Sequence, residues 1–284
     1  MGRYRKILVA IDGSESSRNA LVQAFRLAVD EKCWITVTSV IPPYTGDLDL
    51  TGVTDVRTSL ARPCEEALRE AQKLAEQERV LVKTVCEEGE TWERIVDLAD
   101  AENADIIVMG RRGLRKMART LVGSVTARVI GHTQRDVLVV PKDALVGWKK
   151  VVVGTDGSKF SKVAVDKAIS FAQSYGGELL VISVVDVPVE LYAEAPQAVE
   201  DMVRKAKGYT AAVKSQAEAA GIKVETYVGE AEADEAILKL ARDEAADMIV
   251  VGSHGRTGLR RLLMGSVTEK VIGNAPCPVL VARS

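Results

Sequence analysis

The sequence predicts an α/β protein of two tandem domains, each an open sheet of five parallel strands that alternate with helices. The chain has 284 residues, which suits two domains of ordinary size. Its second half repeats its first: "IIVMGRRGLRKMARTLVGSVTARVIG" at 106–131 returns as "MIVVGSHGRTGLRRLLMGSVTEKVIG" at 248–273. Unbroken apolar runs flanked by helical patterns are typical of parallel strands buried on both faces. We therefore expect domains at 1–145 and 146–284, joined by the short connection "KDALVGW".

The first half contains five apolar runs, each followed by a helical pattern or a turn. Strands are expected over 6–11, 34–41, 81–86, 105–110 and 137–141, with helices through 20–28, at about 58–79 and 91–102, and from about 124. The segment 42–63, "PPYTGDLDLTGVTDVRTSLARP", is rich in loop formers and is interpreted as a surface insertion, with a lid or contact as the alternative.

The second half has the same order of elements. Strands are expected over 150–155, 178–185, 223–228, 247–252 and 278–282, with helices following 156 and over about 197–220, 232–245 and 267–273. Between the second strand and the long helix, "DVPVELYAEAPQ" is shorter than its counterpart in the first half.

Composition excludes several classes of protein. The net charge of −2 gives no argument for binding nucleic acid or an anionic membrane. No apolar run approaches the roughly 18 residues of a membrane helix, and "MGRYRKILVAIDGS" has strand periodicity, so a cytoplasmic protein is expected. The four cysteines lack CxxC spacing, which supports neither a zinc site nor a disulfide framework, and each is interpreted as a buried thiol (Cys33, Cys64, Cys86 and Cys277).

A glycine-rich loop follows the fourth strand of each half. Its glycines have the spacing GxxG, nine residues, then Gly-Ser: Gly110, Gly113, Gly123 and Ser124 in the first copy, and Gly252, Gly255, Gly265 and Ser266 in the second. Backbone N–H groups and a helix amino terminus suit a phosphate, and this is where open α/β sheets bind ligands. A plain strand-to-helix connection is the alternative. The same spacing with different intervening residues favours the phosphate interpretation.

Other residues of the loops allow more than one interpretation. Ser266 with Glu269 fits a capping box, which the first copy lacks because it has Ala127. The arginines, among them Arg111, Arg112 and Arg256, could offset phosphate charge or form a solvated face. His254 has no neighbouring base, acid or metal-ligand spacing, so we interpret it as a loop or ligand contact.

An aspartate ends the first strand of each half. Asp12 in "AIDGSES" and Asp156 in "GTDGSKF" could cap the following helix through an Asx turn, or could reach a ribose hydroxyl or a Mg²⁺ ion. GxGxxG is absent from this turn, and GxxxxGK[ST] is absent from the chain, so neither the usual dinucleotide fingerprint nor a P-loop is present.

At these residues the sequence resembles the universal stress protein family in its tandem form. The resemblance covers the whole chain: "KILVAIDGSESSRNAL" and "KVVVGTDGSKFSKVAV", "ADIIVMG" and "ADMIVVG", the glycine motif, and the closing "VLVV" and "VLVA". It implies a Rossmann-like fold with strand order 3-2-1-4-5 between helices, and ATP bound between strands one and four. If the family's binding mode holds here, the resemblance implies that adenine lies at Val40 or Val184 and that Gly154 lets the nucleotide approach the strand end. It also implies that ribose and phosphates contact the two aspartates and the two glycine loops. Other residues of these loops that would take part are Ser124, Val125, Arg256, Ser266 and Val267.

The two copies match the family unequally. The second has "GSHGRTG", whereas the first has "GRRGLRK" with Lys116 in place of Gly258, so the second site is expected to bind nucleotide better or differently. The resemblance also implies that the halves pair through their last strands as an intrachain pseudo-dimer, and a further homodimer is compatible with this arrangement. The sequence identifies no protein partner.

The sequence favours an ATP-binding stress-response protein in which nucleotide stabilises or switches a conformation with little or no turnover. ADP or AMP would fit the same glycine loop, because backbone N–H groups distinguish poorly between nucleotides with one, two or three phosphates. One alternative is a nucleotide-independent interaction module that regulates partner proteins. Another is slow ATP hydrolysis or autophosphorylation, which needs only a positioned water beside a Mg²⁺-bound triphosphate. An adenylyl-transfer enzyme would require a HIGH or SGGxD signature, and the chain has neither.

Overall fold

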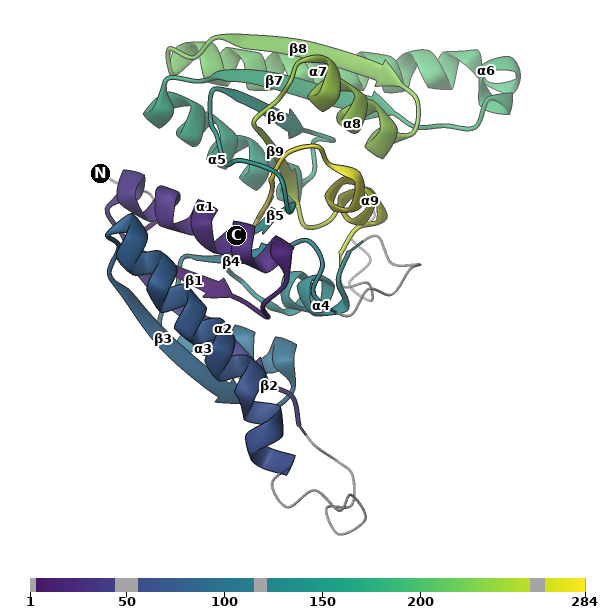
Figure 1. Cartoon of the computed structure of the whole chain (residues 1–284). Coiled ribbons are helices and arrows are strands. Elements are labelled where there is room, and N and C mark those ends of the chain that lie inside the picture. The colour runs from purple at the N-terminus through teal and green to yellow at the C-terminus, as the bar shows by residue number, and fades with distance from the viewer. Residues whose placement is uncertain (1–3, 44–55, 115–121, 256–263, 284) are drawn as a thin grey trace. The chain divides into compact units, whose positions relative to one another are not determined.

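The computed structural model describes residues 4–43, 56–114, 122–255 and 264–283. The chain divides into two compact units, Met1–Asp143 and Ala144–Ser284, and each is an α/β sandwich (Figure 1). Each unit is described by itself below.

The first unit has a five-stranded sheet in the order β3-β2-β1-β4-β5, with every neighbouring pair parallel. The strands are β1 (Lys6–Ala10), β2 (Trp34–Ile41), β3 (Val82–Glu88), β4 (Ile106–Gly110) and β5 (Asp136–Val140). The helices are α1 (Glu15–Glu31), α2 (Val56–Glu78), α3 (Thr91–Ala101) and α4 (Ser124–His132).

The second unit repeats this arrangement, with the order β8-β7-β6-β9-β10 and parallel pairs throughout. The strands are β6 (Lys150–Gly154), β7 (Glu178–Val185), β8 (Val224–Glu230), β9 (Met248–Gly252) and β10 (Val279–Ala282). The helices are α5 (Lys159–Tyr175), α6 (Glu190–Glu194), α7 (Pro196–Ala219), α8 (Ala233–Asp243) and α9 (Ser266–Asn274).

Burial explains why the apolar runs form the sheet. The central strands are buried along almost their whole length, since α1 packs beside α2 on the sheet and α3 packs beside α4 (Figure 1). Phe25 of α1 and Phe171 of α5 are among the largest fully buried side chains. Trp148 stacks on Phe171 with ring centroids 4.0 Å apart. The α/β class, the parallel sheets and the strand order 3-2-1-4-5 within each unit are therefore confirmed.

The segments that follow the second strand of each unit contain helical residues. α2 begins at Val56 and continues through Pro63, in agreement with the helix expected over about 58–79, so the end of the segment 42–63 is helical. Pro63 removes one backbone donor but does not end the helix. In the second unit, "DVPVELYAEAPQ" includes the short helix α6, and α7 then starts with Pro196 at its first position, where the missing N–H has no intrahelical partner in any case.

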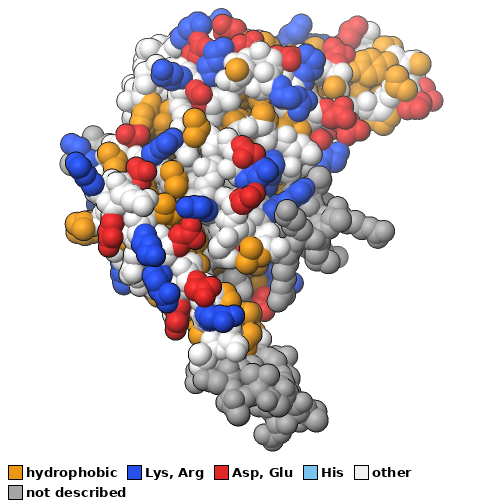
Figure 2. All heavy atoms as spheres, in the orientation of Figure 1, with side chains coloured by type: hydrophobic (Ala, Val, Ile, Leu, Met, Phe, Trp, Pro, Cys, Tyr) orange, Lys and Arg blue, Asp and Glu red, His pale blue; other side chains and the backbone are white. Residues whose placement is uncertain are grey.

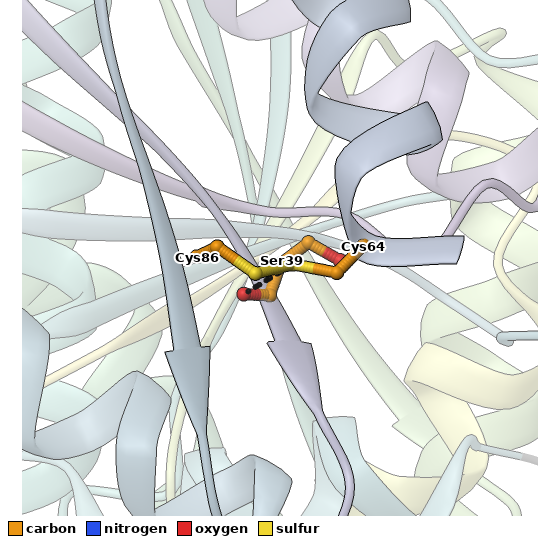
Figure 3. The surroundings of a disulfide bond; sticks show 3 residues. All are labelled: Ser39, Cys64 and Cys86. Atoms are coloured by element: carbon orange, nitrogen blue, oxygen red, sulfur yellow. Dashed lines mark hydrogen bonds between the residues drawn. A yellow bond between two sulfur atoms is a disulfide. The ribbon is translucent and has the colours of Figure 1, made fainter. Parts of the chain in front are cut away.

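The interpretation of all four cysteines as free thiols is wrong for two of them. Cys64 of α2 and Cys86 of β3 form a disulfide, with Cα atoms 6.5 Å apart, and Figure 3 shows it beside Ser39 of β2. The bond was not expected because its cysteines come from separate elements that only the fold brings together. Cys277 is a free, buried thiol as interpreted, whereas Cys33 is free but only half-buried. Burial, followed by the nearby Glu31 for Cys33 and Asp247 for Cys277, raises the pKa of each thiol to about 12.

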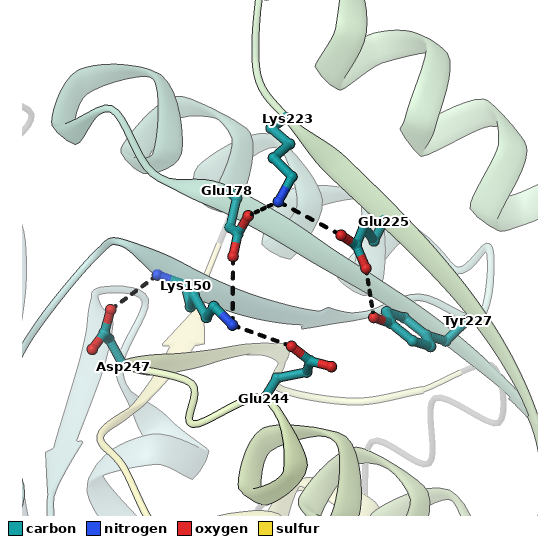
Figure 4. A network of polar contacts seen from close by, with 7 residues as sticks. All are labelled: Lys150, Glu178, Lys223, Glu225, Tyr227, Glu244 and Asp247. Carbon is teal, nitrogen blue, oxygen red and sulfur yellow. Dashed lines mark hydrogen bonds and ion pairs between the residues drawn. The ribbon is translucent and has the colours of Figure 1, made fainter.

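A chain of charged side chains crosses the amino end of the second sheet (Figure 4). Glu178 lies between two lysines: its carboxylate is 2.5 Å from Lys223 Nζ and 3.6 Å from Lys150 Nζ. Lys150 also lies 3.2 Å from Glu244, and Glu225 accepts a 2.9 Å hydrogen bond from the Tyr227 hydroxyl. The hydrogen bond from Lys223, supported by Lys150 and opposed by burial, holds the pKa of Glu178 below its usual value of 4.5.

This network predicts acid-dependent stability of the second unit. Because the folded-state pKa of Glu178 is depressed, its contribution is present above pH 4.5 and is lost as pH falls below that value. We expect Glu178→Gln to lower the free energy of unfolding by about 1 kcal/mol near neutral pH, as for a partly exposed ion-pair network. Urea unfolding read by peptide-resolved hydrogen exchange over β6 and β7 should show this difference shrinking in acid. Equal differences at every pH would contradict the role given to Glu178.

The described surface carries charges of both signs. Figure 2 shows basic and acidic side chains interspersed over the face it displays, and hydrophobic side chains gathered over the α6 end of the second unit. Val189, Tyr192 and Met202 are exposed in that part of the chain. Within the described residues, no helix is both long and apolar enough to cross a membrane.

Candidate functional site

In each unit the candidate site lies where two neighbouring strands end. β1 pairs with β4 and β6 with β9, and in the order 3-2-1-4-5 the chain changes direction between these strands. The carboxyl ends at such a switch point are the usual place for a ligand in an open α/β sheet. The structure therefore brings each aspartate turn beside the glycine loop of its own unit.

Both aspartates form the same turn after the first strand. Asp12 Oδ1 accepts a 3.1 Å hydrogen bond from the N–H of Ser14, and Asp156 Oδ1 accepts one of 2.9 Å from Ser158. The serines are the residues that cap the helices, each accepting a side-chain hydrogen bond from the backbone N–H three residues later. Each aspartate thus makes an Asx turn in which Oδ1 accepts the hydrogen bond from the capping serine, while Oδ2 takes no part in the turn.

The second carboxylate oxygen faces the glycine loop. Asp12 Oδ2 accepts a 2.9 Å hydrogen bond from the N–H of Leu114. A Cβ atom at Gly113 would overlap this oxygen, and one at Gly255 would lie 3.2 Å from Asp156 Oδ2. The second glycine of GxxG is therefore needed for a close approach between the loop and the aspartate.

The first glycine of the motif has a different role. A Cβ atom at Gly110 would lie 2.7 Å from the backbone of Ser16 and Ser17, and one at Gly252 would lie 2.7 Å from the carbonyl oxygen of Phe160. These are backbone atoms at the starts of α1 and α5. Gly110 and Gly252 are thus required by strand-to-helix packing, whatever they do for a ligand.

Hydroxyl groups that the sequence analysis did not single out hold the loops in place. Thr126 Oγ1 donates to the carbonyl of Gly110 at 3.1 Å, and Thr268 Oγ1 donates to that of Gly252 at 2.9 Å. In the first unit, Ser16 Oγ also accepts from the N–H of Arg111 at 2.8 Å. The repeated "GSVT" of the two copies was the available signal for the threonines.

The helices that follow the loops begin without a side-chain cap. Gly123 and Gly265 occupy the N-cap positions of α4 and α9, and neither end has a side-chain cap hydrogen bond. The capping-box interpretation of Ser266 is therefore wrong, because Ser266, like Ser124, is the first helical residue and is exposed. The N–H groups of the first turn, which include those of Val125 and Val267, lack intrahelical acceptors and carry the positive end of the helix dipole. A helix end of this kind is favourable for an anion.

The residues expected near adenine lie on the neighbouring strand. Val40 and Val184 are half-buried near the carboxyl ends of β2 and β7, which flank β1 and β6. A Cβ atom at Gly154 would meet the tip of Ile237 at 3.3 Å, so this glycine also has a packing reason. In the second unit, Tyr209 of α7 lies so close to Gly157, the residue after Asp156, that a Cβ atom at Gly157 would overlap its ring.

The charged residues of the loops are only partly described. Arg256 and Lys116 lie outside the described residues. Burial, and then the neighbouring Arg112, lowers the pKa of the Arg111 guanidinium, as expected where two cations are close together. His254 Nδ1 lies 3.2 Å from Ser253 Oγ, and its ring lies 5.4 Å from that of Phe160. These contacts hold the His254 side chain against Ser253 and Phe160 within its own unit.

A Mg²⁺ ion fits this site only as a companion of phosphates. Among the described residues, no group of three or more His, Cys, Asp or Glu side chains could hold a metal ion. Each site offers one aspartate, and Mg²⁺ is commonly held by one or two carboxylates together with substrate phosphates and water. Asp12 and Asp156 are the residues that could supply that carboxylate.

Comparisons with known proteins agree with the fold. A universal stress protein of Methanocaldococcus jannaschii is 42% identical over 140 residues, covering 48% of this chain and 82% of that protein. One from Mycolicibacterium smegmatis is 29% identical, covering 98% of this chain and 96% of that protein. The crystal structure of a universal stress protein from Archaeoglobus fulgidus has the same fold, with a TM-score of 0.74 at 24% identity over 98% of this chain and 96% of that one. The pattern of the universal stress protein family matches residues 3–141 and 147–283, so the chain belongs to this family and carries two of its domains in tandem.

Proposed function

We propose that the chain is a stress-response protein that binds an adenine nucleotide, ATP, at the switch point of each unit. The observation that carries this proposal is the pair of helix starts, α4 and α9, which carry no side-chain cap and present Ser124 and Ser266 to solvent. A phosphate is the ligand that such an end binds best, since it accepts several N–H hydrogen bonds and interacts favourably with the helix dipole. Ribose would lie toward Asp12 or Asp156, and adenine toward Val40 or Val184.

Binding with little or no turnover is the activity that the described residues support. Catalysis of hydrolysis needs a group that orients water or takes its proton. Each aspartate is engaged in an Asx turn, and His254 contacts Ser253 and Phe160. Bound nucleotide would instead join the aspartate turn, the glycine loop and the helix start, three elements from different parts of one unit. A ligand held by all three stabilises the arrangement in which they meet.

The two sites are expected to differ in affinity. The second loop begins "GSHGRTG" and has the more typical glycine content, whereas the first begins "GRRGLRK". We therefore expect tighter binding at the second site.

Ser266→Glu and Ser124→Glu test the proposal without disturbing the fold. A carboxylate at the first position of a helix interacts favourably with the dipole, so stability should be unchanged or slightly increased. The same carboxylate would repel a phosphate at this end. We expect each variant to lose one nucleotide per chain, and the double variant to lose both. Equilibrium dialysis with ATP, followed by chromatography of the bound nucleotide, gives the count and distinguishes ATP from ADP and AMP.

The matched control makes the same substitution at an exposed serine of a different helix, Ser215→Glu in α7. This control adds the same charge away from both sites and should leave binding unchanged. Binding of two nucleotides by the double variant would overturn the proposed location. Absence of binding by the unaltered chain would overturn the proposal and leave the nucleotide-independent interaction module as the function to pursue.

A further inference from the structure

A cavity of about 360 Å³ opens at the amino ends of β1, β2 and β3 in the first unit, at the opposite end of the strands from the glycine loop. We call it the amino-end cavity. Strand register places its main residues in two rows on one face of the sheet: Lys6, Trp34 and Leu81, then Leu8, Thr36 and Lys83. Glu102, just after α3, lies at its border.

Two large apolar side chains at this cavity are exposed to solvent. Trp34 is 73% exposed and Leu81 is 85% exposed. Single exposed apolar residues are common on protein surfaces, but here two of them line the same hollow. Its volume falls within the roughly 300–1,000 Å³ of small-molecule sites, which are mostly apolar with a few polar groups.

The second unit uses the same positions differently. By strand register and repeat alignment, Trp34 corresponds to Glu178, Leu81 to Lys223, Lys83 to Glu225 and Val85 to Tyr227. In the second unit these four positions form the polar network of Figure 4, in which Glu178 bridges Lys150 and Lys223. Two other members of the network have the same residue type in the first unit: Lys150 corresponds to Lys6, and Glu244 corresponds to Glu102. The first unit therefore has an open apolar surface where its repeat has ion pairs.

The charges at the border favour an anion. Lys83 Nζ lies 2.6 Å from Glu102 Oε1, and Lys6 Nζ donates to the backbone carbonyl of Glu102 at 2.9 Å. Two ammonium groups thus line the cavity with one carboxylate. The nearby Asp105 accepts hydrogen bonds from the backbone N–H groups of Arg5 and Lys6 and does not line the cavity.

We propose that the amino-end cavity binds a small monocarboxylate with an apolar body, such as a medium-chain fatty acid or an aromatic acid. The apolar part would cover Trp34 and Leu81, and the carboxylate would lie between Lys6 and Lys83. Burying the two side chains removes apolar surface from water, which is the main source of affinity for such ligands. The site is distinct from the proposed nucleotide sites and does not depend on them.

Decanoate, used below its micelle-forming concentration, is the probe for the acyl class, and naphthoate is the probe for the aromatic class. Calorimetric titration of the whole chain should show binding of at least one of them, and the stronger binder identifies the class. Decanol, which has no charge, should bind about tenfold more weakly than decanoate, the difference expected for one hydrogen bond to a charged group. 10-Bromodecanoate should quench tryptophan fluorescence through contact with Trp34 if the acyl class binds.

The repeat itself supplies the decisive variant. Trp34→Glu combined with Leu81→Lys gives the first unit the ion pair of the second, so the protein should fold and the binding should disappear. Lys83→Met keeps most of the side-chain length and removes the charge, and it should weaken the carboxylate about tenfold. It should leave decanol binding unchanged. Val29→Lys, at a position 62% exposed on α1, is the control for an added surface charge and should bind as the unaltered chain does.

Three results would overturn the proposal. The first is that neither carboxylate binds the unaltered chain. The second is that the double variant binds both probes as before. The third is that the double variant changes the molecular mass measured by light scattering, since this would identify the exposed Trp34 and Leu81 as a contact between protein chains.

Discussion

Gly252→Val and Gly110→Val are expected to destabilise strongly the units that carry them, whether or not nucleotide is present. An added Cβ atom would lie 2.7 Å from the carbonyl oxygen of Phe160 at one position and 2.7 Å from the backbone of Ser16 and Ser17 at the other. Backbone at a helix start cannot move away as a side chain can. Such overpacking costs about 3 kcal/mol for each variant, a large part of the stability of an ordinary domain.

The measurement is urea unfolding with peptide-resolved hydrogen exchange, which reports β1 and β6 separately. Each variant should lose protection in its own sheet. Gly208→Ala is the control: this glycine lies in α7, no heavy atom is within 4 Å of the added Cβ, and alanine should be neutral or stabilise by about 1 kcal/mol. Full stability of Gly252→Val with lost nucleotide binding would contradict the packing role and restore a role limited to ligand approach.

This result bears on how the glycine motif is interpreted. The equal spacing of the glycines, with different residues between them, indicated that the backbone geometry of the loop is constrained. The close approaches at these glycines confirm that constraint. The sequence could not distinguish a ligand from a neighbouring helix or side chain as the cause. Gly110 is explained by α1, and Gly113 by Asp12. Gly123, an N-cap without a side chain, keeps the strongest case for a ligand.

The fold was more predictable than the site because it depends on long patterns. Apolar runs such as "KILVA" and "KVVVG" mark buried strands, and their alternation with helices predicts parallel pairing. The serine caps of α1 and α5 were less evident, since Asp12 and Asp156 were equally good candidates for that position. Pairing of the halves through their last strands, and a homodimer, stay predictions.

Side-chain contacts between segments far apart in the sequence could not be predicted from any local sequence pattern. The network around Glu178 draws on β6, β7 and β8, and each of its members looks like an ordinary surface charge in the sequence. The disulfide is similar: Cys64 and Cys86 are 22 residues apart, on a helix and a strand whose packing creates the pair. Repeated sequence therefore predicts repeated topology but not repeated chemistry.

Reduction of the Cys64–Cys86 bond is expected to lower the free energy of unfolding of the first unit by about 3 kcal/mol, the loop-entropy value for cysteines 22 residues apart. Cys86→Ser should have a similar effect. The bond joins α2 to β3 next to Ser39, whose carbonyl oxygen lies 3.5 Å from Cys64 Sγ. A reduced Cys64 thiol could donate to that oxygen, which would offset a small part of the loss.

The chain contains its own controls for this prediction, because the second unit holds only Cys277 and no disulfide among its described residues. Urea unfolding with and without a phosphine reductant should move the transition of the first unit and leave that of the second in place. Cys33→Ser should keep the response to reductant. The bond itself is tested by counting thiols in denaturant without reductant, where two are expected. Four reactive thiols, or equal shifts of both units, would contradict the tether, since a crosslink stabilises only the chain segment whose unfolded state it restricts.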